Sequence, residues 1–176
     1  ARDLESGAIA FDAVQCDSRR VEPGDLFVAV RGAACDGHDY IDEAVSRGCA
    51  AVVADRPVCA PPGVPVIVVA DTREAYGRIC QRMAGNPSRQ LKVIGVTGTN
   101  GKTTTSCLVA SVLSTAGFST GLVGTLGAYD GETFGPSGQT TPPADRLARW
   151  LARMVRNGCS HAVLEVSSHA LDQKRL

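Results

Sequence analysis

The sequence predicts an α/β fold, in which a small N-terminal α/β unit is followed by part of a mostly parallel-sheet domain. Short apolar runs typical of strands alternate along the chain with longer segments whose apolar residues recur at helical spacing. In the second half, a glycine-rich turn joins one of these strands to a helix. Because parallel strands need crossover connections, this alternation predicts a sheet with helices on both faces.

Three strands and two helices are expected in the first half of the chain. The strands are the apolar runs over 26–30, 50–54 and 65–70. Between the first two, apolar residues at helical spacing predict a helix over 40–47 that ends at Gly48. A second helix, capped by Asp71 or Thr72, is expected to reach about Met83.

A cluster of helix breakers, Gly85-Asn86-Pro87-Ser88, separates the two halves. We therefore expect one domain over residues 1–88 and a second, incomplete one over 89–176. The elements expected in the second are a strand over 92–96, a helix over about 102–116, a strand over 120–124, a helix after Pro142-Pro143 that ends near Gly158, and a strand over 161–166. Asp130-Gly131 favours a type I′ hairpin turn between them.

Composition excludes several classes of protein. Basic and acidic residues both number 18, so no broad positive field indicates nucleic acid or an anionic membrane as partner. The seven cysteines form no CxxC pair and are odd in number, which fits neither a disulfide framework nor a zinc site and favours a reducing cytoplasm. No apolar run approaches the roughly 20 residues of a membrane span, and no secretion signal is recognisable. We expect a soluble piece of a longer protein.

The most informative segment joins the strand over 92–96 to the helix that follows. It contains Gly98-Thr99-Asn100-Gly101-Lys102-Thr103-Thr104. Glycines allow backbone amides to approach phosphate oxygens, the lysine can reach the outer phosphates, and the hydroxyl after it can hold magnesium. Strict Walker A spacing would place glycine at Val96, so the segment is a variant of that loop. A glycine turn that serves packing alone is the alternative.

Three blocks of sequence resemble the Mur ligase family. The phosphate loop, Thr97 to Thr104, is similar to that of Mur ligases and of folylpolyglutamate synthetases. The first domain adds Asp17-Ser18-Arg19, the run 23–29, Gly32 and Asp36-Gly37, and the second ends with the block 165–175. The N-terminal block is absent from the folate enzymes, so the resemblance favours the Mur ligases.

The resemblance implies that residues 1–88 bind the UDP end of a sugar nucleotide. The family's uridine-nucleotide positions fall on Cys16, Ser18, Ala33, Ala34 and Cys35. From the residues alone, Ser18 is equally a turn or cap residue.

In the second domain the resemblance assigns Gly98, Thr99, Asn100, Gly101, Lys102, Thr103 and Thr104 to the phosphates of ATP. Contacts to a muramoyl-dipeptide are implied for Gln139, Thr140, Thr141, Ser167, Gln173 and Arg175. Many relatives have asparagine at position 139. Read without the family, 139–141 is a loop that caps the next helix.

Lys102 and Glu165 are the residues to which the resemblance gives catalytic roles. Glu165 ends a predicted strand, where ligands bind in open α/β sheets, and with Thr103 it would hold Mg²⁺. His169 is a further candidate near the metal. A solvated carboxylate and a structural histidine are the alternatives for Glu165 and His169.

The activity implied is that of an ATP-dependent amide-bond ligase of peptidoglycan synthesis. It would add the third amino acid, diaminopimelate favoured over lysine, to UDP-N-acetylmuramoyl-dipeptide through an acyl phosphate. Its partners would be that nucleotide and an amino acid, with no nucleic acid or membrane, and it would act as a monomer in the cytoplasm. The family's C-terminal domain is absent from these residues. The alternatives are another Mur ligase step and a non-catalytic nucleotide-binding module; no motif of a GTPase or kinase is present.

Overall fold

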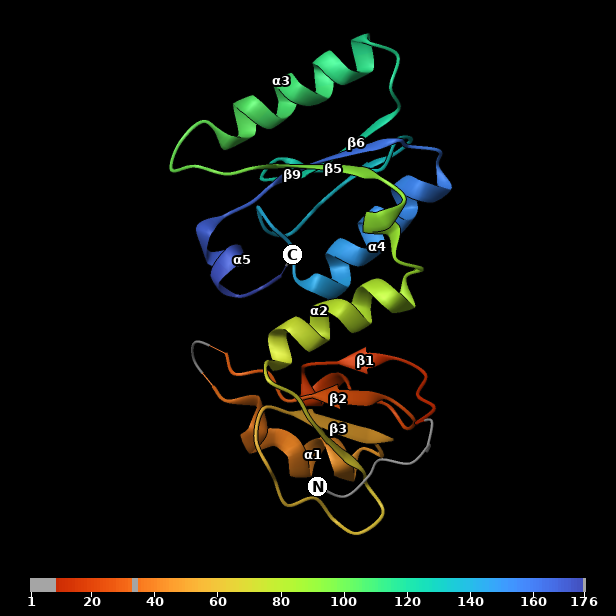
Figure 1. Cartoon of the computed structure of the whole chain (residues 1–176), viewed down its shortest axis with the longest axis vertical. Coiled ribbons are helices and arrows are strands. Elements are labelled where there is room, and N and C mark those ends of the chain that lie inside the picture. Colours follow the sequence, from red (N-terminus) through yellow and green to blue (C-terminus); the bar gives the residue numbers. More distant parts are fainter. Residues whose placement is uncertain (1–8, 33–34, 176) are drawn as a thin grey trace. The chain divides into compact units, whose positions relative to one another are not determined.

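The computed structural model describes residues 9–32 and 35–175, which form two compact units divided at Tyr76 and Gly77 (Figure 1). This division falls inside α2 (Thr72–Met83). The breaker cluster follows that helix and continues into a 3₁₀ turn, η3 (Pro87–Arg89). The domain boundary at residue 88 stays a prediction.

The N-terminal unit contains a four-stranded parallel sheet. Its strands, in the order in which they pair, are β1 (Val14–Gln15), β2 (Leu26–Val28), β3 (Ala51–Ala54) and β4 (Val66–Val68). The crossover between β2 and β3 is η2 (Gly37–Tyr40) followed by α1 (Ile41–Ser46). Three of the strands and the helix were predicted from the apolar pattern, whereas two-residue β1 is too short to give a signal.

Fully buried Phe27 and Val52 lie at the centre of the core of this unit. They pack with Ile41 and Ala44 of α1, which explains the helical spacing of those residues. A second 3₁₀ turn, η1 (Ser18–Arg20), follows β1 and is capped by Asp17, whose carboxylate accepts a hydrogen bond from the amide of Arg19.

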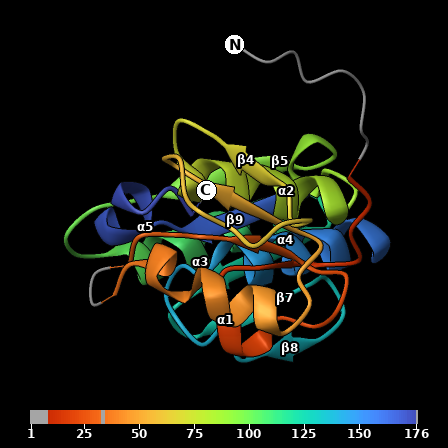
Figure 2. The same cartoon turned by 90° about the horizontal axis from the view of Figure 1, so that it is seen from below.

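The C-terminal unit contains a five-stranded sheet with the order β5-β9-β6-β7-β8. The parallel part consists of β5 (Lys92–Val96), β9 (His161–Glu165) and β6 (Thr120–Gly124). The antiparallel strands β7 (Gly127–Tyr129) and β8 (Phe134–Gly135) lie side by side at one edge (Figure 2). The three longest strands of the sheet are parallel, as expected, whereas β7 and β8 were expected only through the hairpin turn predicted at Asp130-Gly131.

Helices cover both faces of this sheet (Figure 1). On one face lies α3 (Lys102–Thr115), and on the other lie α4 (Ala144–Arg156) and the short α5 (Ser168–Asp172). The buried stripe of α4 packs against the sheet through Leu147, Leu151 and Met154. These observations confirm an α/β fold. Among the described residues no helix is both long enough and apolar enough to cross a membrane.

The predicted type I′ turn at Asp130-Gly131 is wrong. Tyr129 pairs with Phe134, which leaves four residues in the loop, and only Gly131 has a positive φ, whereas a type I′ turn requires one at both central residues. The loop is instead organised by the buried carboxylate of Asp130, which accepts from the amides of Glu132 and Thr133. Although burial raises the pKa of this carboxyl, hydrogen bonds from these amides and from Arg153 lower it to about 2.

We predict that Phe27→Ala destabilises the N-terminal unit by about 3–5 kcal/mol, because it leaves a cavity in a core that cannot collapse fully. The measurement is urea denaturation followed by circular dichroism. Val68→Ala is the control, since Val68 is 53% exposed on β4; we expect it to cost less than about 1 kcal/mol. Equal losses in the two variants would contradict this description of the core.

Candidate functional site

The glycine-rich loop lies between the end of β5 and the start of α3. Gly98 and Gly101 have φ values of 144° and 78°, in the region that only glycine adopts readily. A Cβ on either would meet nothing closer than 3.6 Å, so backbone conformation, not space, requires glycine at these positions. The loop leads into the first turn of α3, where the backbone amides lack partners within the helix, an arrangement that favours an anion.

The side chain of Lys102 reaches back over this loop. Its Nζ donates to the carbonyl oxygen of Gly98 at 2.8 Å and lies 3.4 Å from that of Thr99. The ammonium group is thus held at the mouth of the loop, beside the amides at the start of α3. Positive charge and amide donors together make this the strongest candidate anion site in the described part of the chain.

Glu165 is buried at the carboxyl end of β9, with 2% of its surface exposed. Its carboxylate accepts from the Thr103 hydroxyl at 2.9 Å, and from the amide and hydroxyl of Thr125, both at 3.0 Å. An ionised carboxylate is costly to bury unless donors surround it, and these three hydrogen bonds meet that requirement. The structure therefore brings together Thr103 and Glu165, which lie 62 residues apart in the sequence.

Sequence reasoning missed Thr125. This residue follows β6 directly, and its hydroxyl also lies 3.0 Å from that of Thr140. The preceding residue, Gly124, is needed for the same contact, since a Cβ there would lie 2.1 Å from the Glu165 carboxylate. The available signal was a threonine at the carboxyl end of a predicted parallel strand, the same signal that singled out Glu165.

The predicted contacts to a dipeptide form a second group beside Glu165. The buried Thr141 hydroxyl donates to the carbonyl oxygen of Glu165 at 2.8 Å and accepts from the amide of Ser167 at 3.0 Å. Arg175 donates to the side-chain oxygens of Gln139 and Gln173, each at 2.6 Å, and to the carbonyl oxygen of Thr141 at 3.0 Å. Burial lowers the pKa of the Arg175 guanidinium. Five residues of the predicted set are thus connected by hydrogen bonds.

The donors present fit Mg²⁺ better than a transition metal. Thr103 and Glu165 offer hydroxyl and carboxylate oxygens, the hard ligands that Mg²⁺ prefers, and Mg²⁺ commonly takes its remaining ligands from water and phosphate. His169 is exposed on α5, and no contact joins it to either residue. Within residues 9–32 and 35–175, no group of three or more His, Cys, Asp or Glu side chains could hold a metal ion.

Two of the candidate uridine-nucleotide residues, Cys16 and Ser18, follow the carboxyl end of β1 in the N-terminal unit. Ser18 is buried in η1, and its hydroxyl donates to the carboxylate of Glu43 at 2.6 Å. Cys16 and Cys35 are exposed. Ala33 and Ala34 lie outside the described residues.

A charged cluster at this edge of the sheet was not foreseen. The buried ring of His38 lies between two carboxylates, with Nδ1 2.6 Å from Asp36 and Nε2 3.2 Å from Asp55. Arg56 bridges the same two carboxylates. Although burial raises the pKa of Asp36, hydrogen bonds from the amide and ring of His38 and from Arg56 hold it well below its ordinary value. The cluster ties the segment that follows β2 to the end of β3.

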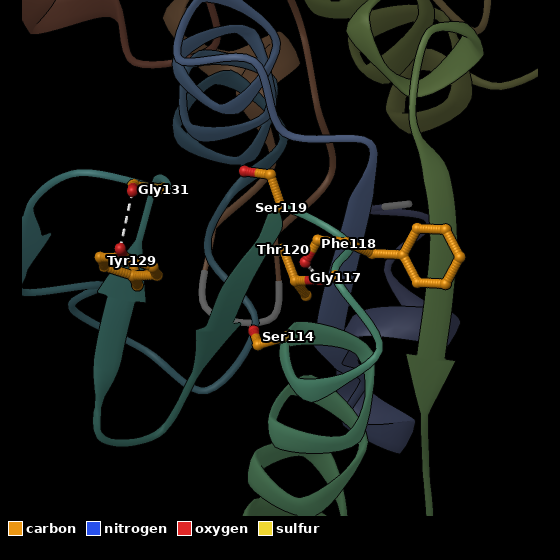
Figure 3. Close-up of a pocket in the computed structure, with 7 residues that line it drawn as sticks. All are labelled: Ser114, Gly117, Phe118, Ser119, Thr120, Tyr129 and Gly131. Atoms are coloured by element: carbon orange, nitrogen blue, oxygen red, sulfur yellow. Dashed lines mark hydrogen bonds between the residues drawn. The ribbon is translucent and has the colours of Figure 1, made fainter.

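A separate pocket of about 320 Å³ lies at the other end of the strands (Figure 3). It is lined by Ser114, Gly117, Phe118, Ser119, Thr120, Tyr129 and Gly131. The ring of Phe118 points away from Tyr129, so the two rings do not form an aromatic cage (Figure 3). None of the predicted site residues lines this pocket.

A glycine loop between a parallel strand and a helix, followed by a lysine and a hydroxyl paired with a buried carboxylate, defines the class: an α/β protein with a phosphate-binding loop. Comparison with known families places it more narrowly. A family model described as "Mur ligase family, catalytic domain" matches residues 10–83, and one described as "Mur ligase middle domain" matches residues 96–176. The chain belongs to the Mur ligase family.

Similar curated proteins include the UDP-N-acetylmuramoyl-L-alanyl-D-glutamate–2,6-diaminopimelate ligases of Parabacteroides distasonis and Geobacillus thermodenitrificans. They are 47% and 45% identical to this chain over 93% of its length. The alignments span 34% and 33% of those ligases, so the chain covers about a third of the relatives that it matches.

Solved structures give the same family. A structure described as UDP-N-acetylmuramoyl-L-alanyl-D-glutamate–2,6-diaminopimelate ligase aligns with a TM-score of 0.76 at 31% identity, over 94% of this chain and 34% of that one. The MurF ligase of Thermotoga maritima, solved in complex with ADP, aligns with a TM-score of 0.55 at 25% identity, over 93% of this chain and 34% of that one.

We predict that Gly124→Ala displaces the Glu165 carboxylate, because the new methyl group would occupy its position. Loss of the hydrogen bonds to a buried charge should lower the free energy of unfolding by about 1–3 kcal/mol. A crystal structure and urea denaturation would measure both effects. Gly95→Ala, in β5 of the same sheet, is the control, since its Cβ would have its nearest neighbour at 3.4 Å. An unmoved carboxylate in Gly124→Ala would contradict the argument.

Proposed function

We propose that this chain is the substrate-binding and nucleotide-binding part of an ATP-dependent ligase of peptidoglycan synthesis. The enzyme would join 2,6-diaminopimelate to UDP-N-acetylmuramoyl-L-alanyl-D-glutamate. The observation that carries the proposal is the pairing of Thr103 with buried Glu165 beside the lysine of the phosphate loop. The named activity of the similar ligases supports the choice of substrate.

The chemistry explains why such an enzyme needs a phosphate-binding loop. A carboxylate cannot form an amide directly, because oxide is a very poor leaving group. Transfer of the γ-phosphoryl group of ATP to the substrate carboxylate gives an acyl phosphate, which the incoming amine attacks with loss of phosphate. Positioning and charge stabilisation dominate such a transfer, so the work of the protein is to bind, orient and neutralise.

Residues 98–104 would perform the first part of that work. The amides at the start of α3 would bind phosphate oxygens, and Lys102 would exchange its carbonyl partners for the outer phosphates, a charge-assisted and therefore stronger interaction. Thr103 and Glu165 would hold Mg²⁺, which when bound neutralises charge on the transferred group. Because Glu165 is already buried and oriented by Thr125, little reorganisation would be required of it.

The hydrogen-bonded group around Arg175 would bind the muramoyl-dipeptide end of the substrate. Thr141 joins this group to Glu165, because it donates to the carbonyl oxygen of Glu165 and accepts from Arg175. A substrate carboxylate bound by Arg175 would therefore lie near the phosphate loop. The guanidinium is the cation suited to the acidic dipeptide, while Gln139, Thr140, Ser167 and Gln173 offer hydroxyl and amide groups. Residues 1–88 would bind the uridine diphosphate, through Cys16, Ser18 and the segment 33–35.

The step in the pathway and the amino acid are also part of the proposal. The chain aligns better with the structure of the diaminopimelate-adding ligase than with that of the MurF ligase, with TM-scores of 0.76 and 0.55. Diaminopimelate is preferred over lysine because the similar ligases are named for it. We further propose a monomer acting in the cytoplasm, without nucleic acid or membrane; the balanced charge agrees with this.

We predict that Lys102→Ala weakens ATP binding by about tenfold or more, because one charge-assisted contact to phosphate is lost. Binding of UDP-N-acetylmuramoyl-dipeptide should be unchanged. Isothermal titration calorimetry with each ligand makes the measurement. Lys92→Ala is a matched control, since Lys92 is exposed at the start of the same strand and outside the loop. If Lys102→Ala lowered the affinity for both ligands equally, the result would argue against two separate sites.

We also predict that the 176 residues on their own bind these nucleotides weakly and catalyse no ligation, because they span only about a third of the similar ligases. Phosphate release from ATP, measured with and without UDP-N-acetylmuramoyl-dipeptide and diaminopimelate, tests this. The full-length protein is the control. Robust release by the 176-residue chain that depends on the muramoyl substrate would refute the prediction.

A further inference from the structure

Glu43 of α1 holds the Ser18 hydroxyl in one orientation. The Oε2 atom of Glu43 accepts from the Ser18 hydroxyl at 2.6 Å. The other oxygen, Oε1, lies 3.3 Å from both Nε and Nη2 of Arg47, one turn further along the helix. Each carboxylate oxygen therefore has its own partner, and the arginine keeps the carboxylate turned toward Ser18.

This contact fixes the direction of hydrogen bonding at Ser18. An ionised carboxylate only accepts, so the hydroxyl must donate its single proton to Glu43. The serine oxygen then has only lone pairs to offer to a ligand. Among the described residues, none donates to this oxygen, and about 5% of Ser18 remains exposed. The Ser18 hydroxyl can thus accept a hydrogen bond from a ligand but cannot donate one.

Ser18 lies where a ligand of a parallel sheet is expected. The turn η1 follows β1, at the same edge as the segment that follows β2, and ligands of open α/β sheets bind outside the carboxyl ends of the strands. Uracil and cytosine differ at N3, which carries a proton in uracil and a lone pair in cytosine; the inference requires that this edge of the base faces Ser18. An oxygen that can only accept would bind the N3 proton of uracil and repel the N3 lone pair of cytosine.

We propose that Glu43 is a positioning residue that makes Ser18 an obligate acceptor, and that this selects uracil over cytosine nucleotides. The inference rests on the proposed function, which places a uridine nucleotide in this unit. Glu43 acts through Ser18 and does not itself touch the base. A purely structural role, tying η1 to α1, would instead weaken the binding of both nucleotides equally.

The test is the ratio of the dissociation constants of CDP and UDP, measured by NMR titration of the 176-residue chain. Glu43→Gln keeps the shape of the side chain, but its amide can also donate to Ser18, which frees the hydroxyl proton to point at the base. We expect the preference of the wild type for UDP to fall by about tenfold, because Ser18 would no longer disfavour the lone pair on N3 of cytosine. Asp42→Asn is the matched control, since it removes the same charge from an exposed position of α1 and should leave the ratio unchanged.

Each outcome decides between the two proposals. A wild-type chain that binds neither nucleotide contradicts the uridine site itself. A chain that binds UDP and CDP equally, or a Glu43→Gln variant that keeps the wild-type ratio, contradicts only the role of Glu43. If Glu43→Gln does not fold, Ser18→Ala replaces it: loss of the preference supports the inference, and an unchanged preference overturns it.

Discussion

Burial of the Glu165 carboxylate is the constraint on which the candidate nucleotide site of the second unit depends. A charge at that depth is stable only if donors reach it from several directions. The donors come from the first turn of α3 and from the residue after β6, so one side chain fixes the positions of three neighbouring elements. The absence of a side chain at Gly124 leaves room for the carboxylate. The same interaction that satisfies the buried charge also places an oxygen pair suited to Mg²⁺ beside the phosphate loop.

The two units place their candidate site residues with the same geometry. In each, parallel strands end at one edge of a sheet, and short polar segments follow them there. In the second unit these segments are the phosphate loop and the residues around Arg175. In the first they include the turn with Ser18 and the cluster around His38. A parallel sheet thus brings residues that are distant in sequence to a common edge without any special contact between them.

Each proposed site also contains a carboxylate that acts on a neighbouring hydroxyl. Glu165 accepts hydrogen bonds from the hydroxyls of Thr103 and Thr125, and Glu43 accepts one from the hydroxyl of Ser18. Because a carboxylate only accepts, each contact sets the direction of the hydroxyl proton and leaves oxygen lone pairs for other partners. In the second unit these lone pairs suit the proposed metal ion, and in the first unit they suit the N–H group of the proposed uracil base.

The sequence by itself determined the alternation of strands and helices, the phosphate loop and its family, because these follow from local spacing. Apolar periodicity sets which face of a segment is buried, and the glycines before Lys102 are required by the backbone whatever surrounds them. Tertiary structure alone decided the partners of Glu165, including Thr125, and the contact between Ser18 and Glu43. It also decided the loop that stands in place of the expected hairpin turn, since Arg153 of α4 reaches the buried carboxylate of Asp130. These contacts join residues far apart in the chain, and which of them meet depends on how the strands pair, which local spacing does not specify.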